Sequence, residues 1–156
     1  MAEDWIEQLM RDYQDRLTRG LYDGISQLPE QELDRVMQCQ AHACVQEFVK
    51  LYDLPEHLDL DAFLERMKIG GPSKINVRRH GDTIFWEELH EGQCMCPLVK
   101  RDVIGLKPEL CHCAVHWLRL LIERHARRGA RVELIESVAT GARNCVFRVI
   151  LEPVSP

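Results

Sequence analysis

The stretch LCHCAVHWLRLLIERH, residues 110–125, decides how the second half of the chain folds. Its apolar side chains recur at steps of three and four residues, which places them on one face of a helix. Gly129 follows as a signal for the end of that helix. The apolar face comprises Leu110, Cys113, Ala114, Trp117, Leu118, Leu121 and His125.

Strand-like sequence lies on both sides of this predicted helix. Before it, residues 74–79 and 83–89 are short, rich in β-branched or aromatic residues, and separated by a glycine-containing turn. After it, residues 131–138 and 144–151 alternate apolar and polar residues around a second glycine-containing turn. We therefore expect two antiparallel hairpins, with the long helix covering one face of their sheet.

The first half of the chain has the periodicity of helices. Apolar residues at helical spacing predict helices over 3–20, from about 33 to 52, and over 60–67, where Gly70-Gly71-Pro72 ends the last one. The fold class we expect is α+β, with N-terminal helices and an antiparallel sheet of hairpins that carries a long helix. At 156 residues the chain is expected to be a single domain, with a helical part over 1–70 and an α+β part over 71–156.

Composition narrows the classes of function. The sequence is 46% hydrophobic and 29% charged, as in soluble globular proteins, and its apolar runs are too short to cross a bilayer. A net charge of −5 gives nucleic acid no general electrostatic reason to bind. The acidic, amphipathic N-terminus does not resemble a signal peptide, so we expect a cytoplasmic protein with no membrane or nucleic-acid partner.

Four of the seven cysteines lie within CMCPLVKRDVIGLKPELCHC, residues 94–113. An odd count and a reducing compartment argue against a disulfide framework. Cys94 and Cys96 lie at the end of strand-like sequence, where residues two apart share a face. Cys111 and Cys113 diverge by about 200° if both are helical, but both can reach one ion if the helix begins near His112.

Four thiolates suit tetrahedral Zn²⁺, and they also suit an iron–sulfur cluster. The positive end of a helix dipole beside Cys111 would favour the thiolate that a metal requires. Two alternatives without metal stay open: reactive or redox thiols, and cysteines that act as small buried hydrophobic residues. Cys39 and Cys44 lie about 140° apart on one helix, and Cys44 falls on its apolar face, so we expect it in the core.

Two groups of polar residues are weaker candidates. His112 and His116 have the i, i+4 spacing of helical metal ligands, but they lie away from the apolar face and are expected to be solvated. Glu87, Glu88 or His90 lies close enough in sequence to the cysteines to act as a base if a metal-bound water performs hydrolysis.

The closing segment VELIESVATGARNCVFRVIL, residues 132–151, resembles the last hairpin of 4-vinyl reductase-type domains, which bind small molecules. Gly141, Cys145 and Phe147 keep the pattern, whereas Ser137 stands where zinc-binding members have a cysteine ligand. The resemblance implies that Cys145 is a metal ligand. It also implies dimers formed through helices, for which the apolar face at 3–20 is a candidate, although that face fits a core position equally well.

Over residues 75–151 the chain is most similar to an uncharacterised cysteine-rich bacterial and archaeal branch of this superfamily, related to aminothiazoline-carboxylate hydrolase-like proteins. The motif residues that carry this similarity are Cys94, Cys96, Pro97, Cys111, Cys113, Trp117, Ser137, Gly141 and Cys145.

The leading hypothesis is a cysteine-ligated metal site, with zinc as the cofactor, in a domain that binds or senses a small molecule. The candidate ligands are Cys94, Cys96, Cys111, Cys113 and Cys145. If one cysteine of the two pairs does not bind, it should be Cys113, because its helical register places it in the core, and Cys145 should replace it. The alternatives are a metal- or thiol-dependent, hydrolase-like enzyme and an iron–sulfur protein.

Overall fold

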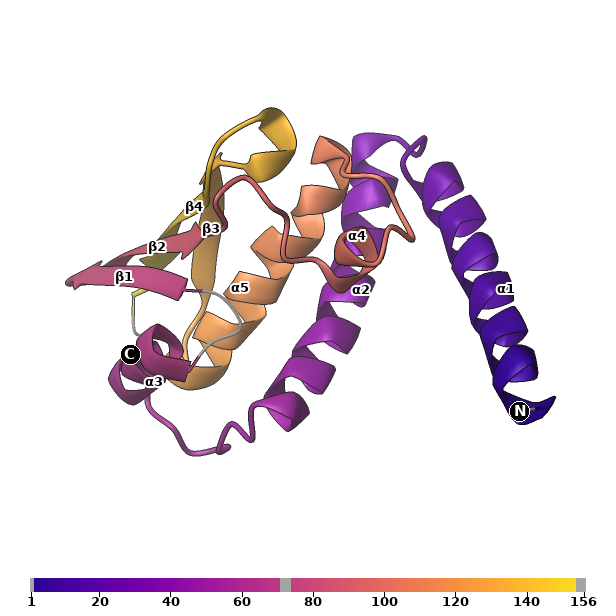
Figure 1. Ribbon diagram of the computed structural model, residues 1–156. Coiled ribbons are helices and arrows are strands. Elements are labelled where there is room, and N and C mark those ends of the chain that lie inside the picture. Colours follow the sequence, from indigo (N-terminus) through magenta and orange to yellow (C-terminus); the bar gives the residue numbers. More distant parts are fainter. Residues whose placement is uncertain (1, 71–73, 154–156) are drawn as a thin grey trace.

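The computed structural model describes residues 2–70 and 74–153, and the statements below concern this part of the chain (Figure 1). It is an α+β fold, as expected from the sequence. In chain order the elements are α1 (Ala2–Ile25), α2 (Glu30–Leu51), α3 (Leu60–Gly70), β1 (Lys74–His80), β2 (Thr83–Leu89), α4 (Pro97–Lys100), the 3₁₀ turn η1 (Pro108–Cys111), α5 (His112–Ala126), β3 (Ala130–Glu136), the 3₁₀ turn η2 (Val138–Thr140) and β4 (Cys145–Leu151).

The strands form one antiparallel sheet in the order β1-β2-β4-β3. The two predicted hairpins are therefore present and join along β2 and β4, where Glu88 lies opposite Cys145. The first hairpin turns at Gly81, whose φ of 60° favours glycine. As predicted, α5 lies across one face of the sheet; α2 packs on α5, and α3 covers the end near β1 (Figure 1).

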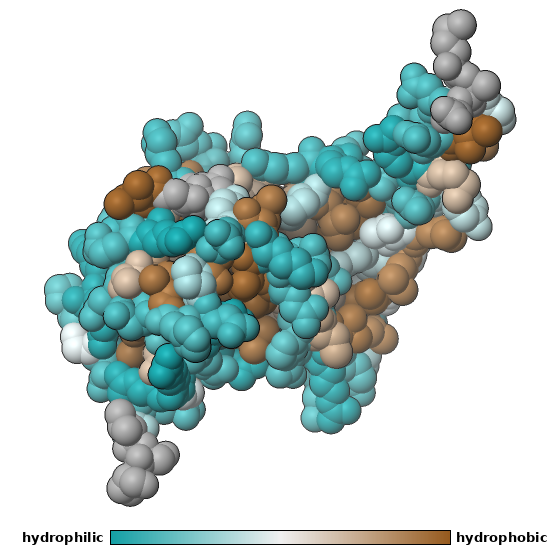
Figure 2. Space-filling model, turned by 90° about the horizontal axis from the view of Figure 1, so that it is seen from below, coloured by the Kyte–Doolittle hydropathy of each residue, from teal (hydrophilic) through white to brown (hydrophobic). Residues whose placement is uncertain are grey.

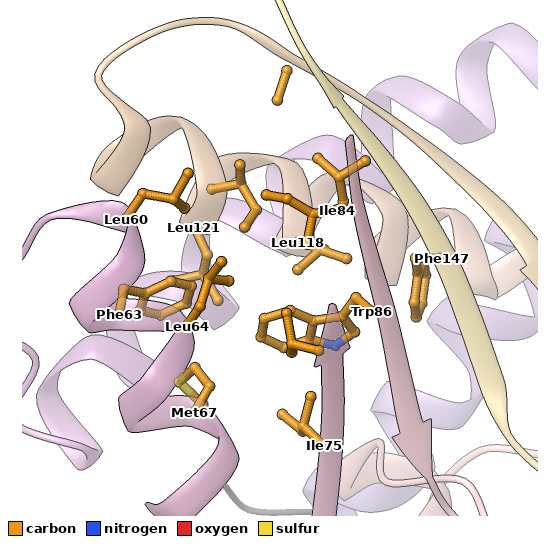
Figure 3. Packing of buried hydrophobic residues seen from close by; sticks show 14 of the residues in the cluster. Leu60, Phe63, Leu64, Met67, Ile75, Ile84, Trp86, Leu118, Leu121 and Phe147 are labelled. Atoms are coloured by element: carbon orange, nitrogen blue, oxygen red, sulfur yellow. The ribbon is translucent and has the colours of Figure 1, made fainter. Parts of the chain in front are cut away.

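The core lies between the sheet, α5 and α3. Trp86 of β2 and Phe63 of α3 are fully buried, with ring centroids 6.2 Å apart, and Leu118 and Leu121 of α5 pack beside them (Figure 3). Trp86 follows the alternation of β2, which sends every second side chain toward α5. This packing fixes the orientation of β2, the strand that leads to the first cysteine pair.

The ends of α5 bear directly on the cysteines. The helix begins at His112, but Cys111 already has right-handed helical dihedral angles at the end of η1, so Cys111 and Cys113 are in the case in which the two side chains diverge. It ends at Ala126 with Arg127 in the left-handed conformation, rather than at Gly129 as predicted. Gly129 lies against the carboxylate of Glu152, the flexible end of that side chain.

Helix α1 stands apart from the body of the protein (Figure 1). Its last turns contact the segment after α4: Arg19 Nε donates to the carbonyl of Val103 at 2.9 Å, and Arg101 pairs with Asp15. The apolar face predicted over 3–20 lies on the other side of α1 and is open to solvent, so it is not part of the core of this chain (Figure 2). Its exposed side chains are Trp5, Ile6, Leu9, Met10, Tyr13, Leu17 and Leu21.

Candidate functional site

Three separate segments bring cysteines to one end of the sheet. Cys94 lies in the loop that follows β2, Cys111 closes η1 before α5, and Cys145 is the first residue of β4. Because β4 runs antiparallel to β2, the start of β4 lies beside the end of β2, and so Cys145 lies beside the loop that carries Cys94. Contacts between η1 and η2 bring Cys111 to the same place.

The thiols of this group are close enough to affect one another's ionisation. Burial raises the pKa of Cys94 to about 11; the backbone N–H of Cys96 opposes this, and the nearby thiols of Cys96, Cys111 and Cys145 add to it. Burial also raises the pKa of Cys111; a hydrogen bond with Ser137 opposes the shift, and Cys145 and Cys96 reinforce it. Cys94, Cys111 and Cys145 therefore lie near one another, and we call these three residues the thiol triangle.

Cys113 and Cys96 extend this group toward α2. Burial raises the pKa of Cys113 to about 12, and the thiols of Cys44, Cys96 and Cys111 raise it further. Cys113 also packs against a second apolar cluster that includes Tyr22. Cys113 thus lies on the core side, as its register predicted, while Cys96 lies between it and the thiol triangle.

Cys44 was expected to be an ordinary core residue, but it lies near Cys96 and Cys113. No local pattern around Cys44 indicated this, because the proximity arises from the packing of α2 on α5. Cys39 is exposed and interacts with none of the other thiols. All seven cysteines are free thiols.

The thiols lie near one another but are not arranged as a metal coordination shell in this structure. Within residues 2–70 and 74–153, no three His, Cys, Asp or Glu side chains already converge as a metal site. The side chains of the thiol triangle are only partly buried. The donor set itself, several thiols from rigidly placed segments, has the chemistry that zinc and iron–sulfur clusters require.

Ser137, which stands where zinc-binding members of the resembled family have a cysteine ligand, lies beside the thiol triangle. Its side chain is buried, accepts a hydrogen bond from the backbone N–H of Ala139, and lies 3.5 Å from the sulfur of Cys111. A cysteine at this position would be a further thiol in the same group. With serine, the group has a hydroxyl instead. Its hydrogen bond favours the Cys111 thiolate and so limits the rise in the pKa of Cys111 that burial causes.

A buried histidine completes the surroundings of the thiol triangle. His90 follows β2, and its Nε2 lies 2.8 Å from Oε2 of Glu88. Glu88 in turn accepts a hydrogen bond from Nε1 of Trp86 at 3.1 Å. Burial lowers the pKa of His90, but interactions with Cys145 and Glu88 outweigh it and raise the value to about 9.

Of the pair His112 and His116 on α5, His116 is mostly buried, contrary to expectation, whereas His112 is 39% exposed. His116 Nε2 lies 2.7 Å from Oδ1 of Asp34 on α2, and His112 Nδ1 lies 3.4 Å from the same oxygen. These contacts tie α5 to α2 and account for both histidines without a metal. They lower the pKa of Asp34, mainly through the hydrogen bond with His116.

Two shallow hollows lie elsewhere on the surface. One, of about 520 Å³, is lined by Asp61, Arg79, His125 and Arg128 among others, and the second lies beside α1, where Arg19 meets Asp102. No cysteine lines either of them. Among the described residues, no helix combines the length and the apolar character that a membrane span requires.

Comparison with solved structures finds likeness in fold. A trafficking protein particle complex subunit 3 from Naegleria fowleri, covalently bound to palmitic acid, is 13% identical, with 97% of this chain and 90% of that chain covered and a TM-score of 0.50. An H-NOX protein from S. oneidensis in the Fe(II)NO ligation state is 15% identical, with 98% and 77% covered and a TM-score of 0.46.

At such low identity the first likeness supports the α+β fold and assigns no activity. No family model and no curated protein matches the chain. The resemblance to 4-vinyl reductase-type domains therefore stays a prediction.

Proposed function

We propose that the protein is a metal-binding domain in which the thiol triangle holds one zinc ion. The observation that carries this proposal is the meeting of Cys94, Cys111 and Cys145, from three segments far apart in sequence, at one end of the sheet. Thiolates are strong zinc ligands, and a site of this kind links the loop after β2 to α5 and β4. Cys96 and Cys113, which the sequence predicted as ligands, adjoin this triangle but are not part of the proposed site.

The electrostatics of the metal-free group favour a cation. The raised pKa values of Cys94 and Cys111 mean that these thiols hold their protons at neutral pH, because burial and each other's charge oppose ionisation. A divalent cation reverses this, since it displaces the protons and neutralises the thiolates. Zinc affinity should therefore fall as the pH is lowered.

Metal analysis tests the proposal directly. Protein purified without oxygen should contain about one zinc per chain and show no visible absorption band. The variant Cys39→Ser should contain the same amount of zinc, because Cys39 is exposed and is not part of the thiol triangle. Visible charge-transfer bands would instead indicate an iron–sulfur cluster, and protein that neither contains nor takes up metal would refute the proposal.

The metal-free protein should become less stable in mildly alkaline solution. The pKa of Cys94 is about 11 in the folded state, against 9.0 for a free thiol. Above about pH 9 the unfolded chain releases this proton while the folded chain retains it, so the free energy of unfolding falls as the pH rises toward 11. Cys113, with a pKa of about 12, acts in the same direction.

Urea denaturation with chelator and reductant measures this effect. The midpoint should be lower at pH 10 than at pH 8, and the difference should be smaller in Cys113→Ser. A midpoint that rises over this range would show that the thiols are not held protonated in the folded state.

A small-molecule ligand and a homodimer are the further parts of the proposal. The ligand is suggested by the resemblance of the closing hairpin to 4-vinyl reductase-type domains. The dimer is suggested by the exposed apolar face of α1. That face includes Trp5 and Tyr13, residue types that dominate protein interfaces, at 61% and 53% exposure.

Light scattering tests the dimer. We expect a mass of twice 18.2 kDa for the wild type and a monomer for Leu9→Glu, in which a charge interrupts the apolar face. Gln8→Glu is the matched control, because Gln8 lies on another side of α1. A monomeric wild type at high concentration would remove the dimer from the proposal.

A thiol-dependent enzyme is the second candidate, favoured by the contact of His90 with Cys145. A cysteine beside a histidine that a carboxylate orients is the arrangement of an activated nucleophile. In that case, Cys145 of the metal-free protein should react with iodoacetamide faster than Cys39, and His90→Asn should abolish the difference. Equal rates for Cys145 and Cys39 would exclude this candidate.

A further inference from the structure

We propose that His90 is the fourth zinc ligand and that it binds through Nδ1, which completes a Cys₃His site with Cys94, Cys111 and Cys145. This inference rests on the proposed metal function and deepens it. The sequence suggested His90 only as one of three possible bases.

The first observation is an unpaired buried nitrogen. The His90 side chain is 3% exposed, yet its Nδ1 has no hydrogen-bond partner. Leaving a polar atom buried and unpaired is costly, and such atoms in native proteins call for an explanation. A metal ion at Nδ1 supplies one.

The second observation is the carboxylate on the other side of the ring. When the ring is neutral, as metal binding requires, the donation of Nε2–H to Glu88 at 2.8 Å leaves the lone pair on Nδ1. Histidines that bind zinc commonly donate their other ring N–H to a carboxylate, which fixes the tautomer and the orientation of the ring. Glu88 is itself held by Nε1 of the fully buried Trp86.

The third observation is the place of the ring. The backbone N–H of His90 donates to Oδ1 of Asn144 at 3.1 Å, which fixes His90 against the residue before Cys145. The imidazole interacts with the Cys145 thiol, one corner of the thiol triangle. The unpaired nitrogen therefore belongs to a side chain that adjoins the predicted ligands and is rigidly held.

His125 shows that burial alone does not single out a ligand. It too is buried with one unpaired nitrogen, Nε2, and its Nδ1 bonds to the carbonyl of Leu58. Its ring, however, stacks on Phe63 within the core, where no thiol adjoins it. Of these two buried histidines, His90 is the one that lies beside the cysteines.

Cobalt(II), which reports on its ligands by absorption, tests the assignment in the full chain. Wild-type protein titrated with Co²⁺ should show tetrahedral d–d bands and a sulfur-to-cobalt charge-transfer band with the intensity of three thiolates. In His90→Asn the d–d bands should shift and Co²⁺ affinity should fall at least tenfold, while the charge-transfer intensity per bound cobalt is retained. Cys145→Ser should bind Co²⁺ much more weakly, and the cobalt that it binds at saturating concentration should show a charge-transfer intensity lower by about a third.

Glu88→Gln gives a second variant that keeps the shape of the side chain. Its amide can donate to Nε2 and so favour the tautomer with the proton on Nδ1, which removes the metal-binding lone pair. We expect roughly a 10- to 100-fold loss of affinity, the range for such supporting residues. Glu65→Gln is the control, because Glu65 lies on α3 and pairs with Lys68 there.

The outcomes separate the inference from the proposed function. A wild type that does not bind Co²⁺ or Zn²⁺ overturns both. Normal metal binding in His90→Asn and Glu88→Gln, with unchanged spectra, overturns the role of His90 alone. A wild-type charge-transfer intensity of four thiolates that falls in Cys96→Ser does the same, since Cys96 would then hold the fourth position.

Discussion

Cys145→Ser should lose its zinc, whereas Cys113→Ser should keep it. Cys145 lies beside Cys94, Cys111 and His90, so its loss removes one corner of the thiol triangle. Cys113 lies on the core side, packed against the cluster that contains Tyr22. The two cysteines therefore have different roles, although both belong to the predicted ligand set.

The loss of zinc should also lower thermal stability. A ligand present at 100 to 1,000 times its dissociation constant stabilises the folded state by about 3–4 kcal/mol. For a chain of this size that corresponds to a decrease of about 10 °C in the melting temperature of Cys145→Ser. Chelator should lower the melting temperature of the wild type by a similar amount and leave the melting temperature of Cys145→Ser unchanged.

Calorimetry together with metal analysis measures both effects. Metal loss in Cys113→Ser but not in Cys145→Ser would mean a site built from the two Cys-x-Cys pairs alone. In that case, the thiol triangle would not be the metal site.

Trp86→Ala should have the largest effect on stability. The indole is fully buried between α3, α5 and the sheet, and its Nε1 donates to Glu88 (Figure 3). Removing a buried tryptophan side chain typically costs about 3–5 kcal/mol, a large part of the stability of a domain. Because Glu88 also loses its hydrogen bond, zinc affinity of the folded fraction should fall as well.

Phe85→Ala is the matched control for this prediction. Phe85 is the preceding residue of β2, points to the other side of the sheet and is 41% exposed. Its truncation should cost less than about 1.5 kcal/mol in urea denaturation of the metal-free protein. A cost for Trp86→Ala as small as that for Phe85→Ala would contradict the packing described for the core.

The fold was largely predictable because its elements have strong local signals. Alternation in β2 and β4 and the helical spacing around Trp117 and Leu118 are set by burial on one face, which is visible in the sequence. The end of α5 was not predictable, because Arg127, and not a glycine, takes the left-handed conformation that closes the helix.

The candidate site was predictable only in part. The two Cys-x-Cys pairs are local patterns, whereas the proximity of Cys44 depends on how α2 packs on α5. The orientation of His90 depends on Glu88 and on Asn144, which lies more than fifty residues further along the chain. The prediction that His116 is solvated was wrong for the same kind of reason. Its side chain is paired with Asp34, which comes from another helix.

X-ray absorption at the zinc edge of the purified protein tests the central claim most directly. The account predicts a first shell of three sulfur atoms at about 2.3 Å and one nitrogen at about 2.0–2.1 Å. In His90→Asn the sulfur shell should remain and the imidazole scattering should disappear. A zinc shell of oxygen and nitrogen without sulfur, or protein that binds no zinc at all, would contradict it.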